Sequence, residues 1–229
     1  MMKILAMDTS NKALSLAILE NKETLGQVTL NIKKNHSITL MPAIDFLMNS
    51  LDMKPTNLDR IAVAQGPGSY TGLRIAVATA KTLAHTLKIE LVGVSSLLAL
   101  VPEQAEGLVI PVMDARRNNV YAGFYQSGQA VRPEAHLPLA EVLEMAGAAN
   151  QSVTFVGETT AFTEQIEAAF PQAAIQSTLP DSVAVGRLGL DLPAQSIHDF
   201  VPNYLKRVEA EENWLKTHQE SSDSYIQRL

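Results

Sequence analysis

The sequence predicts an α/β fold made of two halves of similar layout, each with a mixed sheet flanked by helices. The first observation is a repeated unit: a short apolar run ends in Met-Asp at Asp8 and again at Asp114. Each copy is followed by alternating apolar segments, which are typical of a hairpin, and then by helical and strand patterns. Roughly 100 residues separate the copies, which suits one small domain copied once and exceeds the period of a solenoid.

The first half begins with three predicted strands and a helix. The strands cover residues 4–8, 13–20 and 23–30, where apolar runs or alternation indicate β-structure. The helix covers residues 36–51, where apolar side chains recur with a period of about 3.6 residues. Pro42 suits only the first turn of that helix or a bend in it.

A glycine-rich turn from Gly66 to Arg74 then joins a short buried strand, residues 60–65, to a helix over Tyr70–Leu87. Ser69 is a good N-cap for that helix. Exposed amides and the helix dipole at this place could hold an anion. The spacing matches neither the Walker loop nor the dinucleotide fingerprint, so an architectural role is favoured.

The second half repeats the same order of elements. Strands are predicted over residues 109–115 and 120–125, followed by a late strand over 153–157 and a helix over 161–170. The boundary between the halves falls near residues 100–107, where a proline and a glycine flank an acidic stretch.

These boundaries divide the chain into three parts. Residues 1–103 form an N-terminal subdomain, and residues 104–200 form a C-terminal one. Residues 201–229 form a C-terminal segment, which we expect to be helical over 208–216 and then polar and mobile.

The two helices of the N-terminal subdomain have little polar surface. Counting by four from Gly72 gives a ridge of alanines, which lets another helix approach closely, and the earlier helix carries an apolar stripe. We expect both helices to form an assembly surface through Leu40, Ile44, Leu47, Met48, Gly72, Ala76, Ala80 and Ala84. The alternative is that both are core helices packed on the protein's own sheet.

Composition narrows the function classes. The chain has 229 residues, no cysteine and a net charge of −6, which argues against thiol chemistry and against strong binding to nucleic acid by this chain alone. No apolar run reaches the ~20 residues that span a bilayer, and no signal-peptide pattern opens the sequence. We therefore expect a cytoplasmic location and no membrane partner.

Four motifs occur together and in order: Asp8-Thr9-Ser10, the Gly66-to-Arg74 turn, Met113 to Arg117, and Pro202 to Arg207. This set closely resembles the bacterial TsaB (YeaZ) family, over residues 2–215. A repeated strand–acid–hairpin unit is the layout of the actin, sugar-kinase and Hsp70 (ASKHA) superfamily. The resemblance therefore implies two ribonuclease-H-like halves.

The resemblance also implies a role in forming N6-threonylcarbamoyladenosine beside the anticodon of tRNAs that read codons beginning with A. TsaB is the non-catalytic partner of its paralogue TsaD, in a complex that includes the ATPase TsaE. We expect this chain to bind TsaD through its helices, to support docking of TsaE, and to pair with itself when TsaD is absent. It would meet tRNA only through the complex.

Catalytic and metal residues are not expected. The catalytic paralogue carries a His-x-x-x-His metal pair where this chain reads Val-Ser-Ser-Leu-Leu-Ala, residues 94–99. Serine and leucine side chains cannot replace two imidazoles as metal ligands, and no two of the five histidines have helical ligand spacing.

The sequence also contains candidate residues for nucleotide binding. In related ATPases the acid and hydroxyls after the first strand approach Mg²⁺ and phosphate, so Asp8, Thr9 and Ser10 are the candidates, with Asp114 as the matching acid. Structural capping by Asp8 and Ser10 is the favoured alternative, and we expect no cofactor. Two rival functions remain: an independent ASKHA-type ATPase or small-molecule kinase, and a tRNA-binding subunit.

Overall fold

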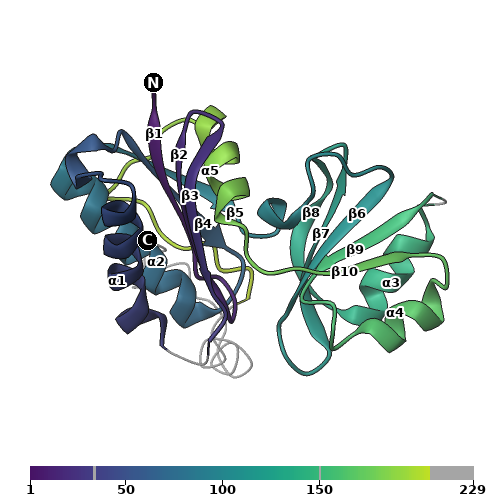
Figure 1. Cartoon of the computed structure of the whole chain (residues 1–229). Helices are drawn as coiled ribbons and strands as arrows, with labels where there is room; N and C mark the ends of the chain where they lie inside the picture. The colour runs from purple at the N-terminus through teal and green to yellow at the C-terminus, as the bar shows by residue number, and fades with distance from the viewer. Residues whose placement is uncertain (33–34, 150, 207–229) are drawn as a thin grey trace, which may run out of the picture.

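The computed structural model describes residues 1–32, 35–149 and 151–206, which form two lobes side by side (Figure 1). Each lobe has one five-stranded sheet, with the orders β3-β2-β1-β4-β5 and β10-β9-β6-β7-β8. In both sheets the central strand pairs antiparallel with the next strand of the chain and parallel with a later strand. The two sheets thus share one topology, which confirms the predicted duplication.

The first lobe contains the strands β1 (Lys3–Asp8), β2 (Leu14–Glu20), β3 (Glu23–Leu30), β4 (Arg60–Gly66) and β5 (Glu90–Ser95). Its helices are α1 (His36–Ser50), α2 (Tyr70–Leu87) and α5 (Ser182–Asp191), with a short 3-10 turn, η1 (Pro55–Asn57). Helices α1 and α2 cover the outer face of the sheet, and α5 covers the face toward the second lobe (Figure 1).

The period-two alternation of the strands explains this three-layer arrangement. On β1, Leu5 and Met7 pack with α1 and α2, whereas Ile4 and Ala6 pack with Val185 of α5. Because both faces are covered, the central strands read as continuous apolar runs.

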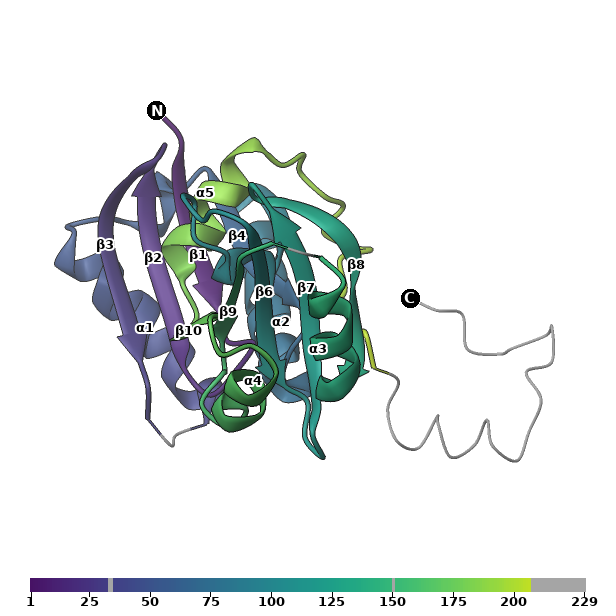
Figure 2. The same cartoon turned by 90° about the vertical axis from the view of Figure 1, so that its right-hand side faces the viewer.

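The second lobe contains β6 (Leu108–Asp114), β7 (Asn119–Gln126), β8 (Gln129–Pro138), β9 (Val153–Gly157) and β10 (Ala174–Ser177). Helices α3 (Leu139–Gly147) and α4 (Thr163–Ala169) lie on its outer face (Figures 1 and 2). The inner face packs against η2 (Leu98–Leu100), a 3-10 turn in the connection between the lobes.

The chain returns to the first lobe after β10, which corrects the predicted domain boundaries. Helix α5 packs on β1, β2 and β4, and Phe200 joins the core beneath α1 and α2. The predicted C-terminal subdomain, residues 104–200, therefore extends too far, since residues 182–200 belong to the first lobe. Residues 207–229, where a helix and a mobile tail were expected, lie outside the described residues.

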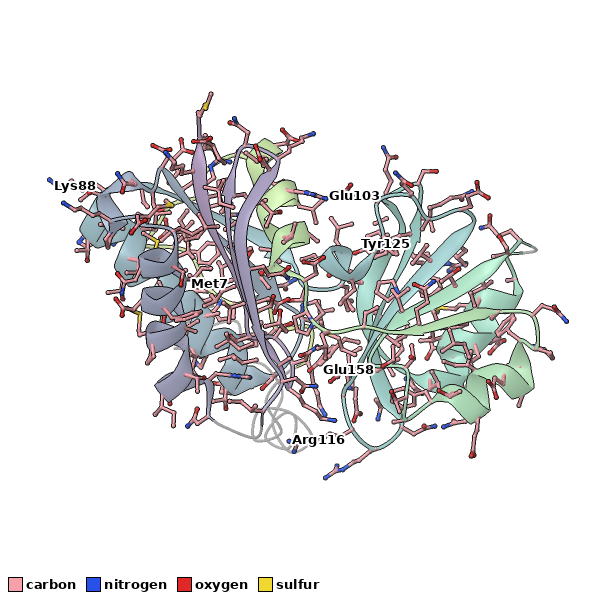
Figure 3. All side chains as sticks on the ribbon, in the orientation of Figure 1. Met7, Lys88, Glu103, Arg116, Tyr125 and Glu158 are labelled. Atoms are coloured by element: carbon pink, nitrogen blue, oxygen red, sulfur yellow. The ribbon has the colours of Figure 1, made fainter. Side chains whose placement is uncertain are left out.

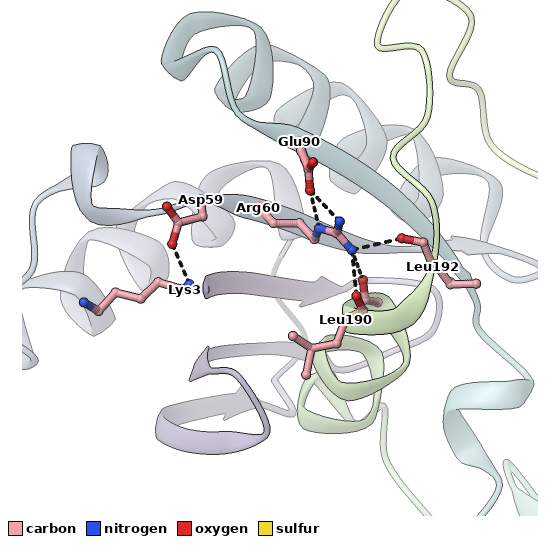
Figure 4. Close-up of polar contacts among 7 residues, drawn as sticks. Lys3, Asp59, Arg60, Glu90, Leu190 and Leu192 are labelled. Carbon is pink, nitrogen blue, oxygen red and sulfur yellow. Dashed lines mark hydrogen bonds and ion pairs between the residues drawn. The ribbon is translucent and has the colours of Figure 1, made fainter. Parts of the chain in front are cut away.

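Arg60 fixes α5 on the first sheet (Figure 4). Its guanidinium Nη1 donates to the carbonyl oxygens of Gly189, Leu190 and Leu192, at 2.6, 3.0 and 3.0 Å. Its Nε donates to the Glu90 carboxylate at 2.8 Å. The last carbonyls of a helix have no partner within the helix, so Arg60 supplies the missing donors at the end of α5.

No helix in the described part of the chain combines the length and apolar character that a membrane span requires.

Candidate functional site: a helical face and an interlobe cleft

The eight residues predicted to contact a partner are buried in the first lobe itself. Ala76, Ala80 and Ala84 have no exposed surface, and Leu40 is 1% exposed. A Cβ added at Gly72 would overlap the carbonyl oxygen of Thr9. The other three, Ile44, Leu47 and Met48, belong to the same core. The small-residue ridge therefore serves close packing of α2 on its own sheet, and the choice of these residues as a contact surface was wrong.

The opposite side of the two helices is exposed and partly apolar. On α1, Ile38, Met41 and Phe46 are 66%, 48% and 62% exposed. On α2, Ala78 and Thr82 are exposed one turn apart. We call these five residues the outer helical face. Large apolar side chains that remain this exposed on one helix layer are typical of an interaction surface.

The segment after β1 is held by its own backbone contacts. Asp8 Oδ1 accepts a hydrogen bond from the Ser10 amide at 2.8 Å, and Thr9 Oγ1 donates to the carbonyl of Gly72 at 2.8 Å. The Ser69 amide donates to the Ser10 carbonyl at 2.6 Å, and Ser69 caps α2 as predicted. Two of the three nucleotide candidates thus make structural contacts through their side chains.

The carboxyl group of Asp8 is completely buried. Burial raises the pKa of its carboxyl above the ordinary value, and the proximity of Ser10 only partly opposes this shift. Burial disfavours the ionised form of this carboxyl. Its Oδ2 atom and the Ser10 hydroxyl are buried without a partner among the described residues.

A cleft of about 810 Å³ lies between the lobes. It is lined by Ser10, Asn11, Lys12, Asn31, Ile32, His36, Gly68, Ser69, Tyr70, Thr71, Met113, Asp114, Ala115, Arg116, Tyr121, Glu158 and Lys206. Figure 3 labels Arg116 and Glu158 on the side of the second lobe that borders this space. The structure thus brings the predicted candidates Ser10 and Asp114 to one cleft, whereas Asp8 is buried and does not line it.

Two acids of the second lobe also line the cleft. Glu158 accepts the Asp114 amide at 2.9 Å, and burial raises the pKa of Glu158. Asp114 accepts the amide of Arg116 at 2.7 Å and so stabilises the turn after β6. Glu158 and Asp114 therefore give the cleft a pair of acids beside its basic side chains. The residues that the structure describes contain no group of three or more His, Asp or Glu side chains that could hold a metal.

An aromatic cluster at the edge of the cleft was missed in the sequence. The rings of Tyr70 and Tyr204 stack with centroids 4.9 Å apart, and the Arg74 guanidinium carbon lies 4.8 Å from the Tyr70 centroid. Both tyrosines belong to motifs noted above, but they are more than 100 residues apart, so only the tertiary structure shows the pair.

A family model described as "TsaD: tRNA N6-adenosine threonylcarbamoyltransferase" matches residues 21–214. The chain is 40% identical over 229 residues to the "tRNA threonylcarbamoyladenosine biosynthesis protein TsaB" of Bacillus subtilis (strain 168), with 94% of this chain and 99% of that protein covered.

Two solved structures are similar to this chain in fold. The structure titled "YeaZ from Pseudomonas aeruginosa" matches with a TM-score of 0.78 and 28% identity, covering 90% of this chain and all of that one. A ROK hexokinase from Thermus thermophilus matches with a TM-score of 0.50 at 11% identity, covering 82% of this chain and 97% of that one. The second match shows a shared fold alone.

Proposed function

Because the chain belongs to the TsaB family of tRNA threonylcarbamoyladenosine biosynthesis proteins, we propose that it is the non-catalytic subunit that binds and activates TsaD. The chain also matches a TsaD family model, which is expected if TsaB and TsaD are paralogues that share one fold. The main support for the proposal is the outer helical face. Ile38, Met41 and Phe46 remain exposed there, whereas the other side of α1 is buried in the core.

This surface suits a helical partner. Ile38 and Met41 are three residues apart and share one side of α1, and Phe46 lies on the same solvent-facing half of the helix. Ala78 and Thr82 are small, so a facing helix can approach α2 closely. TsaD, as a paralogue, would present its equivalent helices, and the two pairs would form a four-helix seam. A second copy of this chain would use the same face when TsaD is absent.

The contacts of Asp8 and Thr9 support a non-catalytic role. Both side chains make hydrogen bonds that stabilise the loop after β1. Activation then arises from binding: the seam must stabilise one conformation of TsaD more than another. The assembled pair would offer TsaE a docking place, and the complex would work on tRNA in the cytoplasm.

The direct test is reconstitution. Purified chain, TsaD and TsaE are mixed with tRNA, and threonylcarbamoyladenosine is measured with each protein omitted in turn. We expect modification to need all three proteins. Full activity without this chain, or turnover by this chain alone, contradicts the proposal.

A pair of variants tests the face itself. Phe46→Asp places a charge in the seam and should weaken association with TsaD at least tenfold, as measured by sedimentation. Val131→Asp is the matched control, because Val131 is a similarly exposed apolar residue, 52%, on β8 of the second lobe. Equal effects of both changes would place the contact elsewhere.

The interlobe cleft favours one alternative, an ASKHA-type ATPase or small-molecule kinase that uses Ser10 and Asp114. Calorimetry with Mg-ATP on the isolated chain tests it. Binding with hydrolysis would favour this alternative over the scaffold.

A further inference from the structure

The cluster of Tyr70, Tyr204 and Arg74 lies on the surface although aromatic rings normally favour burial. Tyr70 is 44% exposed and Tyr204 is 40% exposed, and their rings meet at an interplanar angle of 29°. An exposed pair of this kind offers an accessible aromatic surface to another flat ring. Burial of its hydroxyl raises the pKa of Tyr204, so this phenol stays neutral under ordinary conditions.

Cations gather beside this cluster in a chain whose net charge is −6. Lys12, Arg116 and Lys206 line the cleft together with Tyr70. The same lining holds two acids, Asp114 and Glu158, so its three cations leave a surplus of one positive charge. The local surplus of positive charge therefore opposes the overall charge of the protein, which favours an anionic ligand at this place.

Hydrogen-bond donors also line the cleft. Ser10 is 1% exposed and lines the cleft, and its hydroxyl has no partner among the described residues. The 18-residue helix α2 begins at the same place, with Tyr70 and Thr71 lining the cleft. The first turn of a helix carries unsatisfied N–H groups and a partial positive charge, both of which attract an oxyanion.

We propose that this surface holds one nucleotide of single-stranded RNA when the chain is part of the modifying complex, with the base against the Tyr70–Tyr204 pair and a phosphate in the cleft. Aromatic side chains beside a cationic groove are the usual means of holding single-stranded nucleic acid. The proposal rests on the function proposed above, since it places the RNA contact within the assembly with TsaD. The acidic chain alone would bind RNA weakly.

The first test measures the stacking contribution. Binding of labelled tRNA to the assembled complex is followed by fluorescence anisotropy, with Tyr204→Ala and Tyr204→Phe compared against the unchanged chain. Removing one stacking ring should weaken tRNA binding about tenfold, and Tyr204→Phe should stay within about twofold because the ring remains.

The second test measures the phosphate contribution through the dependence on salt. Lys12→Gln or Lys206→Gln should reduce the slope of log affinity against log salt by about 0.7 for each lost contact to a single strand. Lys22→Gln is the matched control, since Lys22 is exposed in the turn between β2 and β3, outside the cleft. Its slope should be unchanged.

Assembly is measured by sedimentation on the same samples. Unchanged tRNA affinity in Tyr204→Ala complexes that still contain TsaD overturns the RNA contact and leaves the scaffold function standing. A chain that does not associate with TsaD at all overturns both proposals. If Mg-ATP binds the isolated chain and Tyr204→Ala weakens that binding without changing tRNA affinity, the site holds a free nucleotide and the RNA contact is wrong.

Discussion

Ser95 of the first lobe donates a hydrogen bond to the carboxylate of Glu134 in the second lobe. The Tyr125 hydroxyl donates to the same carboxylate oxygen from β7. Ser95 Oγ also accepts the amides of Leu97 and Leu98, at 3.2 and 3.1 Å, where the chain enters the connection to the second lobe. One carboxylate therefore joins β5, β7 and β8, and Figure 3 labels Tyr125 on the side of its sheet that faces the first lobe.

This junction predicts a loss of stability when the carboxylate is removed. Glu134→Ala leaves two partly buried hydroxyls without their acceptor, so the free energy of unfolding should fall by about 1–3 kcal/mol. Tyr125→Phe removes one donor and should cost less, about 1 kcal/mol. Urea unfolding measures both, with Glu144→Ala on the exposed side of α3 as the control. Equal stability of Glu134→Ala and Glu144→Ala would contradict the role of the junction.

Helix α2 allows its two sides to be compared with one substitution. Ala80 has no exposed surface, so Ala80→Arg forces a guanidinium against the sheet and should destabilise the fold by more than about 3 kcal/mol. Ala78 lies on the outer helical face, so Ala78→Arg should leave thermal unfolding almost unchanged and weaken association with TsaD. A folded Ala80→Arg protein that fails to bind TsaD would restore the buried ridge as the contact surface.

The pH dependence of stability should change when Asp8 is replaced. The folded pKa of Asp8 lies above its ordinary value of 3.8, so between these two values the folded state binds more protons than the unfolded state. The free energy of unfolding therefore falls as pH rises through that window. Asp8→Asn stays neutral and retains an acceptor for the Ser10 amide, so it avoids this loss.

Urea unfolding of both proteins from pH 4 to pH 7 measures the difference. The variant should gain stability relative to the unchanged chain as pH rises, and Glu158 contributes equally to both curves. The opposite trend, with the unchanged chain gaining relative to the variant, would mean that Asp8 is stabilised as a carboxylate in the fold.

The contacts of Arg60 predict how strongly α5 is held on the first sheet. Arg60→Met removes the donors to three carbonyls at the end of α5 and leaves them partly buried, so we expect a loss of about 2–4 kcal/mol and faster hydrogen exchange in α5. Arg187→Gln is the control on the same helix, because its ion pair with Glu103 is exposed and contributes at most about 1 kcal/mol. Unchanged exchange in Arg60→Met would contradict the attachment.

The sequence by itself determined most elements and the duplication. Apolar runs ending in Met-Asp predicted β1 and β6, and the helical period predicted α1 and α2 with Ser69 as the cap. These signals are local, because a strand or helix pattern depends on residues within a few positions of one another. The ordered motifs likewise identified the family, which the 40% identical relative confirms.

The tertiary structure alone decided which side of each helix meets the sheet. Ala78 and Ala80 are both alanines on one helix, and their pattern does not show which of them faces β4 and which is exposed. Only the tertiary structure shows that α5 returns to the first lobe, where Arg60 contacts the end of this helix. The stacking of Tyr70 on Tyr204 is likewise visible only in the tertiary structure. Such pairings depend on packing between distant segments, about which local periodicity carries no information.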